Sequence, residues 1–327
     1  MSGARDWARL LRVSALFTVP GDALAGAAAA GVRVDRRAMF AVGCSLCLYE
    51  AGMALNDWAD QDEDARERPD RPLPSGRIRP AAALGAAIGL TGAGLVLAAR
   101  ASRPAATVAG ALAATVWAYD LKLKHTFAGP AAMAAARGLD LLLGAVAAGG
   151  RPRPAVLLST AALAAHTYAV TQVSRHETTG GSGAAPLAAL ATSVVIGAGI
   201  GWESFRSLRG PDAVGGPDAV GRAVLTAPEH RAIAPRSGES ARGRSPSHAL
   251  TVLALATAYG ATATRPYAHA VLNSSPAFTQ RAVRGGIGAL IPLQAVLAAR
   301  AGSPVLGGAV MALLPMAHRF SRKVSPT

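Results

Sequence analysis

The stretch that decides the fold is Asn56-Asp57-Trp58-Ala59-Asp60-Gln61-Asp62-Glu63-Asp64, which directly follows the apolar residues 38–55. Glu50 is the single charged residue in that approach. A bilayer core is crossed by about 20 mostly apolar residues, so the acidic stretch falls where a membrane helix meets water. Carboxylates are costly at that depth, and they mark a functional site there by default.

The spacing of the acidic stretch gathers its oxygen atoms. At about 100° per residue, a helix places Asn56, Asp57, Asp60 and Asp64 within an arc of roughly 100°. Several oxygen ligands over two turns suit Mg²⁺, which shares the rest of its coordination shell with water and phosphate oxygens. A solvated acidic helix end is the alternative. The i, i+4, i+8 spacing at a membrane boundary favours the metal site.

The composition excludes an ordinary soluble protein. Of 327 residues, 51% are hydrophobic and 16% are charged, whereas a soluble domain carries about 25% charged residues. The mean hydropathy is +0.30. The net charge of +14 comes mostly from arginines. Because no basic patch is interleaved with base-stacking aromatics, we expect membrane lipid rather than nucleic acid as the partner of this charge.

Charge-poor segments recur along the chain, and several reach the length of a membrane span. We predict an all-α, polytopic transmembrane bundle of nine or ten helices around a central cavity, with the short eighth segment deciding the number. The predicted helices cover residues 11–31, 37–60, 80–100, 103–119, 127–149, 154–176, 184–203, 248–265, 277–300 and 302–319.

Alternation of the predicted helices places three polar loops on one side of the membrane. These loops are residues 57–79, 119–126 and 175–183. The first two are rich in Arg and Lys, although arginines also occur in loops on the other side, so the positive-inside bias is modest. We expect an integral protein of a bacterial cytoplasmic membrane, with the acidic site facing the cytoplasm.

Residues 204–247 differ from the rest of the chain. They are rich in Gly, Pro, Ser and Arg and contain the hexapeptide Gly-Pro-Asp-Ala-Val-Gly twice in tandem, at 210–215 and 216–221. Such a segment buries too little apolar surface to fold alone. We therefore expect one membrane domain over residues 1–327, interrupted by a disordered insertion at 204–247.

Two of the polar loops bring cations to the acidic stretch. In the first, Arg71 and Arg77 could clamp a diphosphate through forked donors, or could balance the neighbouring carboxylates. In the second, Lys124 follows Tyr119 by five residues and is either a phosphate-binding point charge or an interfacial anchor. Both loops are consistent with an anion site beside the carboxylates.

Further polar residues lie inside or just after predicted helices. Arg137 and Asp140 are three residues apart among apolar neighbours; they neutralise each other, or Arg137 reaches an anionic substrate. Arg175 and Glu177 follow the sixth predicted helix, where Glu177 offers one more carboxylate. Tyr168 could line a cavity, or could simply pack.

Together these residues resemble the UbiA superfamily of intramembrane prenyltransferases. The acidic stretch fits the family's first motif, N-D-x-x-D-x-x-x-D, and residues 71–78 follow as the family-like R-P-L-P-S-G-R-I. The resemblance extends over nearly the whole helical pattern, excludes the insertion, and is nearest to the EboC-like branch.

The resemblance implies Mg²⁺-dependent transfer of an isoprenoid group from a prenyl diphosphate to an unknown hydrophobic acceptor, small and either aromatic or lipidic. It places the metal on Asn56, Asp57, Asp60, Asp64 and Glu177. It places the diphosphate on Arg71, Arg77, Lys124, Arg137 and Arg175. The catalytic residues it implies are Asp57, Asp60, Asp64, Lys124 and Tyr119. In this scheme Tyr119 or Tyr168 stabilises an allylic carbocation through its ring face.

One departure from the family affects the metal. The second Asp-rich motif of familiar members is replaced here by Ser174-Arg175-His176-Glu177, in which only Glu177 is a carboxylate. Binding of a second Mg²⁺ is therefore left open, and Arg175 could supply part of its charge.

Three other functions compete with this interpretation. A CDP-alcohol phosphotransferase would share Asp57-x-x-Asp60, but Gln61 stands where its motif needs glycine and the second half is missing. A non-catalytic isoprenoid-binding or lipid-binding protein could have kept the first motif and lost the second. A transporter is disfavoured because the polar groups gather at one face rather than near the midplane.

Overall fold

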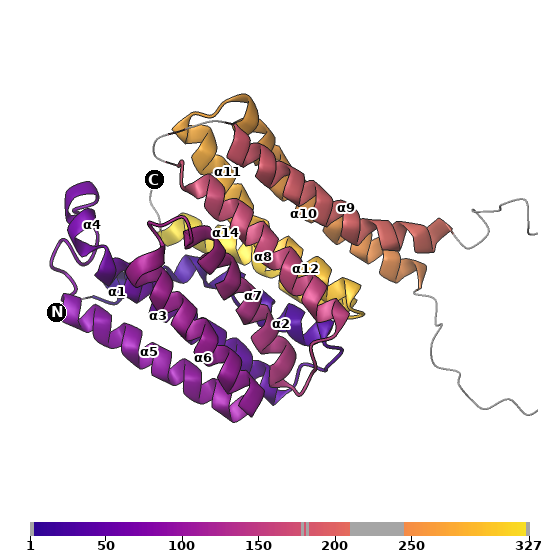
Figure 1. Cartoon of the computed structure of the whole chain (residues 1–327), viewed down its shortest axis with the longest axis horizontal. Coiled ribbons are helices and arrows are strands. Elements are labelled where there is room, and N and C mark those ends of the chain that lie inside the picture. The colour runs from indigo at the N-terminus through magenta and orange to yellow at the C-terminus, as the bar shows by residue number, and fades with distance from the viewer. Residues whose placement is uncertain (1–2, 178–179, 181–182, 210–244, 325–327) are drawn as a thin grey trace, which may run out of the picture.

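Helices make up all the regular structure in the part of the chain that is described. The computed structural model describes residues 3–177, 180, 183–209 and 245–324, and it contains no strand within them (Figure 1). Residues 210–244, which form the centre of the predicted insertion, lie outside the described residues. The two ends of the predicted insertion are helical and not disordered, because α9 runs to Arg209 and α10 begins at Pro246.

The first half of the chain supplies the helices that carry the acidic stretch. In chain order they are α1 (Ala4–Leu10), the 3₁₀ turn η1 (Val13–Thr18), α2 (Pro20–Ala29), α3 (Arg36–Ala59), α4 (Gln61–Glu67), α5 (Pro80–Ala101), α6 (Arg103–Ala118), the π-helical turn η2 (Tyr119–Leu123) and α7 (Gly129–Ala147).

The second half packs against α7 and α2. Its helices are α8 (Pro154–Ser174), α9 (Ala184–Arg209), α10 (Pro246–Leu272), α11 (Pro276–Gly288), α12 (Leu290–Arg300), α13 (Pro304–Met311) and α14 (Leu313–Val324). Helix α5 and the α9–α10 pair lie at opposite edges of the bundle (Figure 1).

Every predicted segment contains helix, but three of them are divided. The predicted helix 11–31 becomes the 3₁₀ turn η1 followed by α2, which begins at Pro20, and prolines break two others. The predicted helix 277–300 divides into α11 and α12, and 302–319 divides into α13 and α14. Proline has no N–H for the carbonyl four residues earlier. Pro292 therefore cannot donate to the carbonyl of Gly288 at the end of α11, and Pro315 cannot donate to that of Met311 at the end of α13.

Helix α10 is longer than predicted because it continues through a proline. We expected this helix to end at 265, yet it runs through Pro266 to Leu272. Gly285 of α11 lies against the Pro266 ring, so close that a Cβ at Gly285 would be 2.6 Å from Pro266 Cγ. Membrane helices tolerate proline where a neighbouring helix packs closely against the break.

Glycines let α2 and α7 approach until their backbones touch. A Cβ on Gly26 would collide with the carbonyl of Leu141, and a Cβ on Gly144 would collide with the carbonyl of Ala23. Small residues allow such contact between helices in lipid, where packing replaces the hydrophobic effect. The contact fixes the position of α7, which forms one wall of the candidate site.

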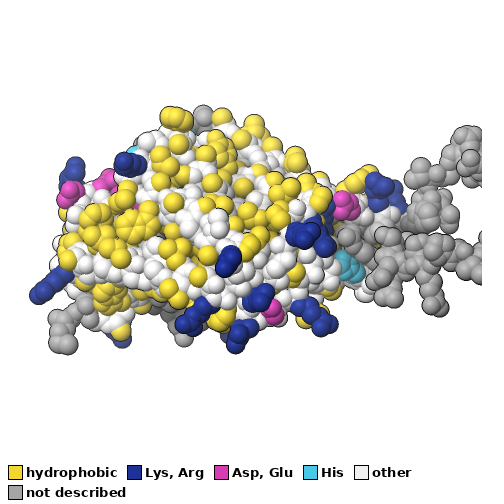
Figure 2. Space-filling view, turned by 60° about the horizontal axis from the view of Figure 1, so that its bottom comes forward, with side chains coloured by type: hydrophobic (Ala, Val, Ile, Leu, Met, Phe, Trp, Pro, Cys, Tyr) yellow, Lys and Arg dark blue, Asp and Glu magenta, His cyan; other side chains and the backbone are white. Residues whose placement is uncertain are grey.

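The exposed surface is that of a membrane protein. Six helical stretches are long and apolar enough to cross a bilayer: Arg36–Ala59, Pro80–Ala101, Gly129–Ala147, Pro154–Ser174, Ala184–Arg209 and Pro276–Arg300. Large apolar side chains such as Ile88, Leu157 and Val195 are exposed on these helices. In Figure 2 hydrophobic side chains cover the middle of the face, while Lys and Arg lie at its ends and along one margin. A soluble monomer rarely exposes so much contiguous apolar surface.

Candidate active site at the mouth of the bundle

Two helices present the acidic stretch. Helix α3 carries Asn56 and Asp57, Asp60 is its C-terminal cap, and α4 carries Asp64. Backbone hydrogen bonds continue across the junction, from Asp60 N to Asn56 O at 3.0 Å and from Asp64 N to Asp60 O at 2.8 Å. Asp57 and Asp64 are nearly buried, with 5% and 3% of their surface exposed.

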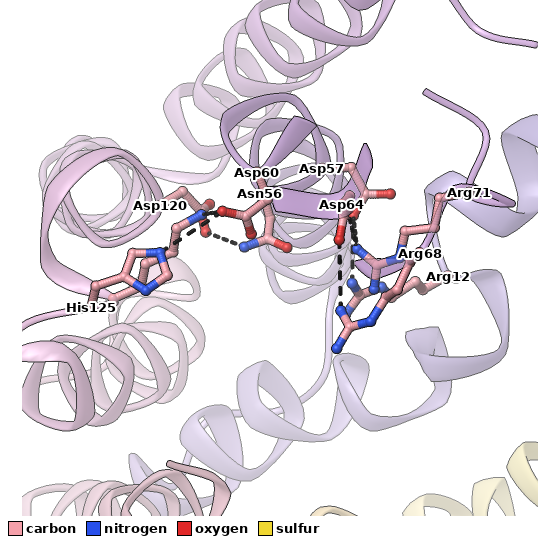
Figure 3. Close-up of polar contacts among 10 residues, drawn as sticks. Arg12, Asn56, Asp57, Asp60, Asp64, Arg68, Arg71, Asp120 and His125 are labelled. Carbon is pink, nitrogen blue, oxygen red and sulfur yellow. Dashed lines mark hydrogen bonds and ion pairs between the residues drawn. The ribbon is translucent and has the colours of Figure 1, made fainter. Parts of the chain in front are cut away.

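The four predicted ligands of the acidic stretch separate into two clusters (Figure 3). We call the first the arginine cluster; it consists of Asp57, Asp64, Arg12, Arg68 and Arg71. Arg71 donates to both carboxylates, at 3.4 Å from Asp57 and 2.5 Å from Asp64. Arg12 adds a contact to Asp57 at 3.5 Å, and Arg68 lies 3.7 Å from Asp64. One guanidinium thus bridges two of the predicted ligands.

The second cluster, which we call the lysine cluster, consists of Asn56, Asp60, Asp120, Lys124 and His125. Lys124 forms an ion pair with Asp60, and His125 Nε2 lies 3.9 Å from the same carboxylate. The Asn56 side-chain amide donates to Asp120 at 3.3 Å. This cluster joins the end of α3 to η2, which follows α6.

Burial is the main influence on the pKa of Asp120, which lies in η2 and outside the candidate membrane spans. Removal from water raises the pKa of Asp120 to about 7. The hydrogen bond from Asn56 and the charge of Lys124 oppose this rise, and the charge of Asp60 adds to it. The lysine cluster therefore contains a carboxyl that changes charge near neutral pH.

The chemistry of the donor atoms fits a hard divalent cation. One ligand atom each from Asp60, Glu63 and His125 lies within 4.8 Å of the others. Two of the three are carboxylates, and the amide and carboxylate oxygens of Asn56 and Asp120 lie beside Asp60. Mg²⁺ prefers such oxygen donors over imidazole nitrogen. The lysine cluster with Glu63 therefore fits Mg²⁺.

A cavity of about 240 Å³ opens beneath the two clusters. Arg12, Asn56, Tyr119 and Asp120 line its mouth end. The remaining walls come from α2, α3, α6 and α7, and are formed by Val19, Ser45, Leu48, Tyr49, Gly52, Met53, Leu112, Val116, Met133, Ala136, Arg137 and Asp140. The walls are largely apolar, with a polar group at the far end.

The structure brings some predicted residues together and places others elsewhere. Tyr119 lines the cavity. Tyr168 is 42% exposed on α8 and accepts from its helix neighbour Gln172. Arg77 pairs with Asp6 at 3.2 Å and with the carbonyl of Asp70. Neither of these two residues is drawn into a cluster at the mouth.

Three more predicted residues have partners of their own. Arg137 forms an ion pair with Asp22 of α2, well along α7 from the acidic stretch. Arg175 donates to the carbonyl of Thr126 in the loop before α7. Burial raises the pKa of Glu177, and the charges of Arg284 and Arg68 oppose that rise. The Arg175–Glu177 loop thus lies over the mouth without joining the lysine cluster.

Sequence reasoning missed several residues of the site. Arg12 precedes α2 by eight residues and gave no motif signal. Glu63 was not among the residues predicted to share the helix arc, but its carboxylate lies with Asp60 and His125 in the group that could hold a metal. Asp120 and His125 lie on either side of Lys124, and their polarity in the loop 119–126 was the signal that could have found them.

Comparison with known proteins identifies the fold and the family. Residues 14–180 match the UbiA prenyltransferase family model, which is just over half of the chain. The chain belongs to the UbiA prenyltransferase family. The CDP-alcohol phosphotransferase alternative is thereby set aside, while the EboC-like branch stays a prediction.

The curated relatives share one name. Digeranylgeranylglyceryl phosphate synthase from Methanopyrus kandleri is 35% identical over 147 residues, which is 45% of this chain and 52% of that protein. The protein of the same name from Methanothrix thermoacetophila is 36% identical over 120 residues, covering 36% and 45%. The matches therefore span about half the length of these relatives.

Solved structures show the same fold at low identity. A structure titled as insight into digeranylgeranylglyceryl phosphate synthase in membranes aligns with a TM-score of 0.56 and 16% identity, over 93% of this chain and 99% of that one. The apo structure of a UbiA homolog from Aeropyrum pernix K1 gives 0.52 and 18%, over 91% and 96%. The UbiA fold, and with it an integral membrane protein, is confirmed.

Proposed function

We propose that this UbiA-family chain is a Mg²⁺-dependent intramembrane prenyltransferase that uses a prenyl diphosphate donor. The observation that carries the proposal is the alternation of carboxylates and cations around one cavity mouth. Asp57, Asp60 and Asp64 are each paired with Arg or Lys. A magnesium diphosphate has the complementary charges, because its cation fits the carboxylates and its phosphate oxygens fit the guanidinium and ammonium groups.

We assign the metal to Asn56, Asp60 and Glu63, with Asp57, Asp64 and Asp120 as further oxygen ligands. When bound, Mg²⁺ would neutralise charge on the diphosphate as it leaves. The charges that act on Glu177 are those of Arg284 and Arg68, and none of the proposed ligands is among them. We therefore keep Glu177 at the rim of the mouth.

The chain's own residues would hold the diphosphate and shield the reaction. Arg71 and Lys124 exchange their carboxylate partners for phosphate oxygens, and Arg12 lies at the cavity mouth to join them. Tyr119 faces the cavity, where its ring can stabilise positive charge on the isoprenoid carbon. The apolar walls exclude water that would otherwise intercept that carbon.

The acceptor class follows from the relatives. Their name describes a glyceryl phosphate that carries two isoprenoid groups, so we propose a lipidic, hydroxyl-bearing acceptor rather than an aromatic one. The cavity, at 240 Å³, is smaller than the 300–1,000 Å³ typical of drug-sized ligand sites. The isoprenoid tail would then extend between helices toward lipid.

Domain organisation and orientation complete the proposal. We propose one UbiA-like membrane domain over residues 1–327, with residues 210–244 inserted between α9 and α10. The mouth, which Arg12, Arg68, Arg71 and Lys124 surround, would face the cytoplasm in keeping with the positive-inside rule.

The test is an assay of purified protein in lipid nanodiscs. Geranyl, farnesyl and geranylgeranyl diphosphates, each radiolabelled, are incubated with Mg²⁺ and either a prenylated glyceryl phosphate or a simple phenol. Release of pyrophosphate with a labelled lipid product supports the transferase. Tight binding without release would instead support the non-catalytic isoprenoid-binding alternative. No binding of any prenyl diphosphate would refute both.

A further inference from the structure

The cavity beneath the mouth has a definite depth. Asn56 of α3 and Gly129 of α7 mark its mouth end, because Asn56 belongs to the lysine cluster and a Cβ on Gly129 would lie 2.9 Å from the carbonyl oxygen of Lys124. Ser45 and Asp140 line its deep end, where the Ser45 hydroxyl donates to the Asp140 carboxylate. On each helix the two ends are eleven residues apart, so α3 and α7 both give a depth of about 16 Å.

The bundle is closed beyond this depth. Leu141 and Gly144 follow Asp140 on α7, and their backbones contact α2 at Gly26 and Ala23. The side chains around these contacts are almost fully buried in one hydrophobic cluster, which includes Ala23, Ala41, Cys44 and Leu143. A chain that enters from the mouth therefore cannot continue straight past Asp140.

The deep end is also polar and held in place. We call Ser45, Arg137 and Asp140 the polar floor of the cavity. Arg137 forms an ion pair with Asp22 of α2, and Asp22 accepts from Gln294 Nε2 of α12 at 2.6 Å. Both partners are fully buried. An apolar chain could pass only by separating these groups, and buried polar groups that lose their partners are costly.

Mostly apolar side chains line the cavity between the mouth and the polar floor. At the helical rise they fall into two layers, measured from Asn56, Tyr119 and Gly129 at the mouth. The first layer, at about 5–6 Å, consists of Gly52, Met53, Val116 and Met133. The second layer, at about 10–12 Å, consists of Leu48, Tyr49, Leu112 and Ala136.

An isoprenoid chain repeats at nearly the same interval. Each isoprene unit adds four bonds to the main chain, and four bonds of about 1.5 Å advance an extended chain by about 5 Å. The first isoprenoid carbon lies beside the diphosphate at the mouth. The first unit then spans to the first layer, the second unit to the second layer, and the third unit ends at the polar floor.

We propose that this cavity selects the donor by length: it holds three isoprene units, the number in farnesyl diphosphate, and the polar floor stops the chain there. The proposal rests on the proposed prenyltransferase function. Leu112 and Ala136 are the specificity-determining residues for the third unit, because they flank the space next to the floor. A fourth unit gains nothing from the cavity, and only that part of a longer tail would lie between helices.

The first test compares kcat/KM for donors of two, three and four units. Purified protein in nanodiscs receives Mg²⁺, geranyl, farnesyl or geranylgeranyl diphosphate, and whichever of the prenylated glyceryl phosphate and the phenol reacts. The kcat/KM for farnesyl diphosphate should exceed that for geranyl diphosphate by about tenfold or more, since even one methylene group in a fitted apolar pocket contributes that much, and geranylgeranyl diphosphate should stay within about threefold of farnesyl.

Ala136→Leu should shorten the cavity to two units. The added side chain occupies the space of the third unit, so kcat/KM for farnesyl diphosphate should fall about tenfold while that for geranyl diphosphate changes less than about threefold. Ala136→Val adds less volume and should give a smaller fall of the same kind. Ala135→Leu, the same substitution at an exposed position outside the cavity lining, is the matched control and should keep the wild-type order of donors.

Photocrosslinking locates the end of the chain without requiring turnover. Geranyl, farnesyl and geranylgeranyl diphosphates that carry a diazirine on the last unit are bound with Mg²⁺ in the absence of acceptor and irradiated, and mass spectrometry identifies the labelled residues. The farnesyl probe should label the polar floor at Ser45 or Asp140. The geranyl probe should label the second layer at Leu48 or Ala136, and the geranylgeranyl probe should label lipid.

The two measurements separate this inference from the function beneath it. Labelling of the floor without any product would refute the transferase and support the length limit. An active enzyme that prefers geranylgeranyl over farnesyl diphosphate by about tenfold, or whose farnesyl probe labels no floor residue, would overturn only the length limit. Equal falls for geranyl and farnesyl diphosphates in Ala136→Leu would also overturn it. Binding of none of the probes would refute both.

Discussion

The guanidinium of Arg71 lies 2.5 Å from a carboxylate oxygen of Asp64, seven residues earlier in the chain. The same guanidinium contacts Asp57 of α3 at 3.4 Å. The residues proposed to bind a metal and the residues proposed to bind a diphosphate are therefore already partners.

Loss of a carboxylate from either cluster should abolish Mg²⁺-dependent transfer. Asp60→Asn and Asp64→Asn each remove an anionic oxygen ligand, and we expect at least a 100-fold loss of labelled product, of the order found for loss of a group that stabilises charge at the reacting centre. Asp62→Asn, at an exposed position of the same helix, is the control and should retain activity. Membrane insertion should be unchanged in all three. Full activity of Asp60→Asn would contradict the ligand assignment.

Substitution of the two arginines in the Arg71–Ile78 motif should affect the KM for the prenyl diphosphate differently. Arg71→Ala removes the guanidinium at the mouth, and the loss of a charge-assisted contact worth about 1.5–3 kcal/mol should raise KM for the prenyl diphosphate about 10- to 100-fold. Arg77→Ala breaks contacts with Asp6 and Asp70 instead. Its KM should stay within about threefold of wild type. Equal effects would show that Arg77 also reaches the diphosphate.

Substitutions in the group formed by Asp60, Glu63 and His125 should show which metal ion the site prefers. Glu63→Gln should raise the Mg²⁺ concentration for half-maximal activity by about tenfold, because it removes a charged oxygen ligand. His125→Ala should leave Mg²⁺ activation unchanged, because Mg²⁺ seldom binds imidazole. Activity is measured during titration of Mg²⁺ into chelator-treated protein. A strong effect of His125→Ala would indicate a softer metal.

Much of the fold was predictable because lipid imposes a simple rule on sequence. Every segment predicted from apolar length contains helix, including the short eighth one at α10, although the predicted helix 11–31 is divided into η1 and α2. The breaks at Pro292 and Pro315 follow from the missing N–H of proline. The sequence alone, however, does not show whether a proline ends a helix or only bends it. Pro266 shows the difficulty, since its helix continues where packing against Gly285 compensates.

The site was predictable as a group of residues but not as a set of pairs. Periodicity placed Asp57, Asp60 and Asp64 near one another, and they lie about the junction of α3 and α4, where the cap at Asp60 divides them between two clusters. It could not show that Arg71 would bridge two of them while Lys124 took the third, because those contacts join loops that no periodic pattern relates. For the same reason the sequence did not show that Arg137, a candidate for the diphosphate, pairs with Asp22 of α2, which is distant in sequence but packs against α7.

Metal-free protein should become less stable as pH rises toward neutrality. The folded protein holds the proton of Asp120 until about pH 7, whereas an unfolded chain releases it near its ordinary value, about 3.9. The contribution of Asp120 to the free energy of unfolding is thus largest below about pH 4 and is lost as pH rises through 7. Thermal unfolding in detergent between pH 5 and 8 checks this. Asp120→Asn should reduce the slope; an unchanged slope would contradict the assignment.

Close contact between α2 and α7 should make one glycine indispensable. Gly144→Ala drives a methyl group into the carbonyl of Ala23, and overpacking of this kind costs about 1–3 kcal/mol. Gly85→Ala on α5 meets nothing within 4 Å and should be neutral or stabilising by up to about 1 kcal/mol. The melting temperatures of the two variants give the comparison. A stable Gly144→Ala would mean that the helices can separate.

The salt pairs at the mouth make the two halves of the donor complex depend on each other. Magnesium entering alone would strand Arg71 and Lys124 without counter-ions, and a diphosphate entering alone would strand Asp60 and Asp64. The free energies of the two binding events are thus linked, by the 1–3 kcal/mol usual for coupled ligands. If the proposed donor binds here, each half should therefore bind about 5- to 150-fold more tightly in the presence of the other.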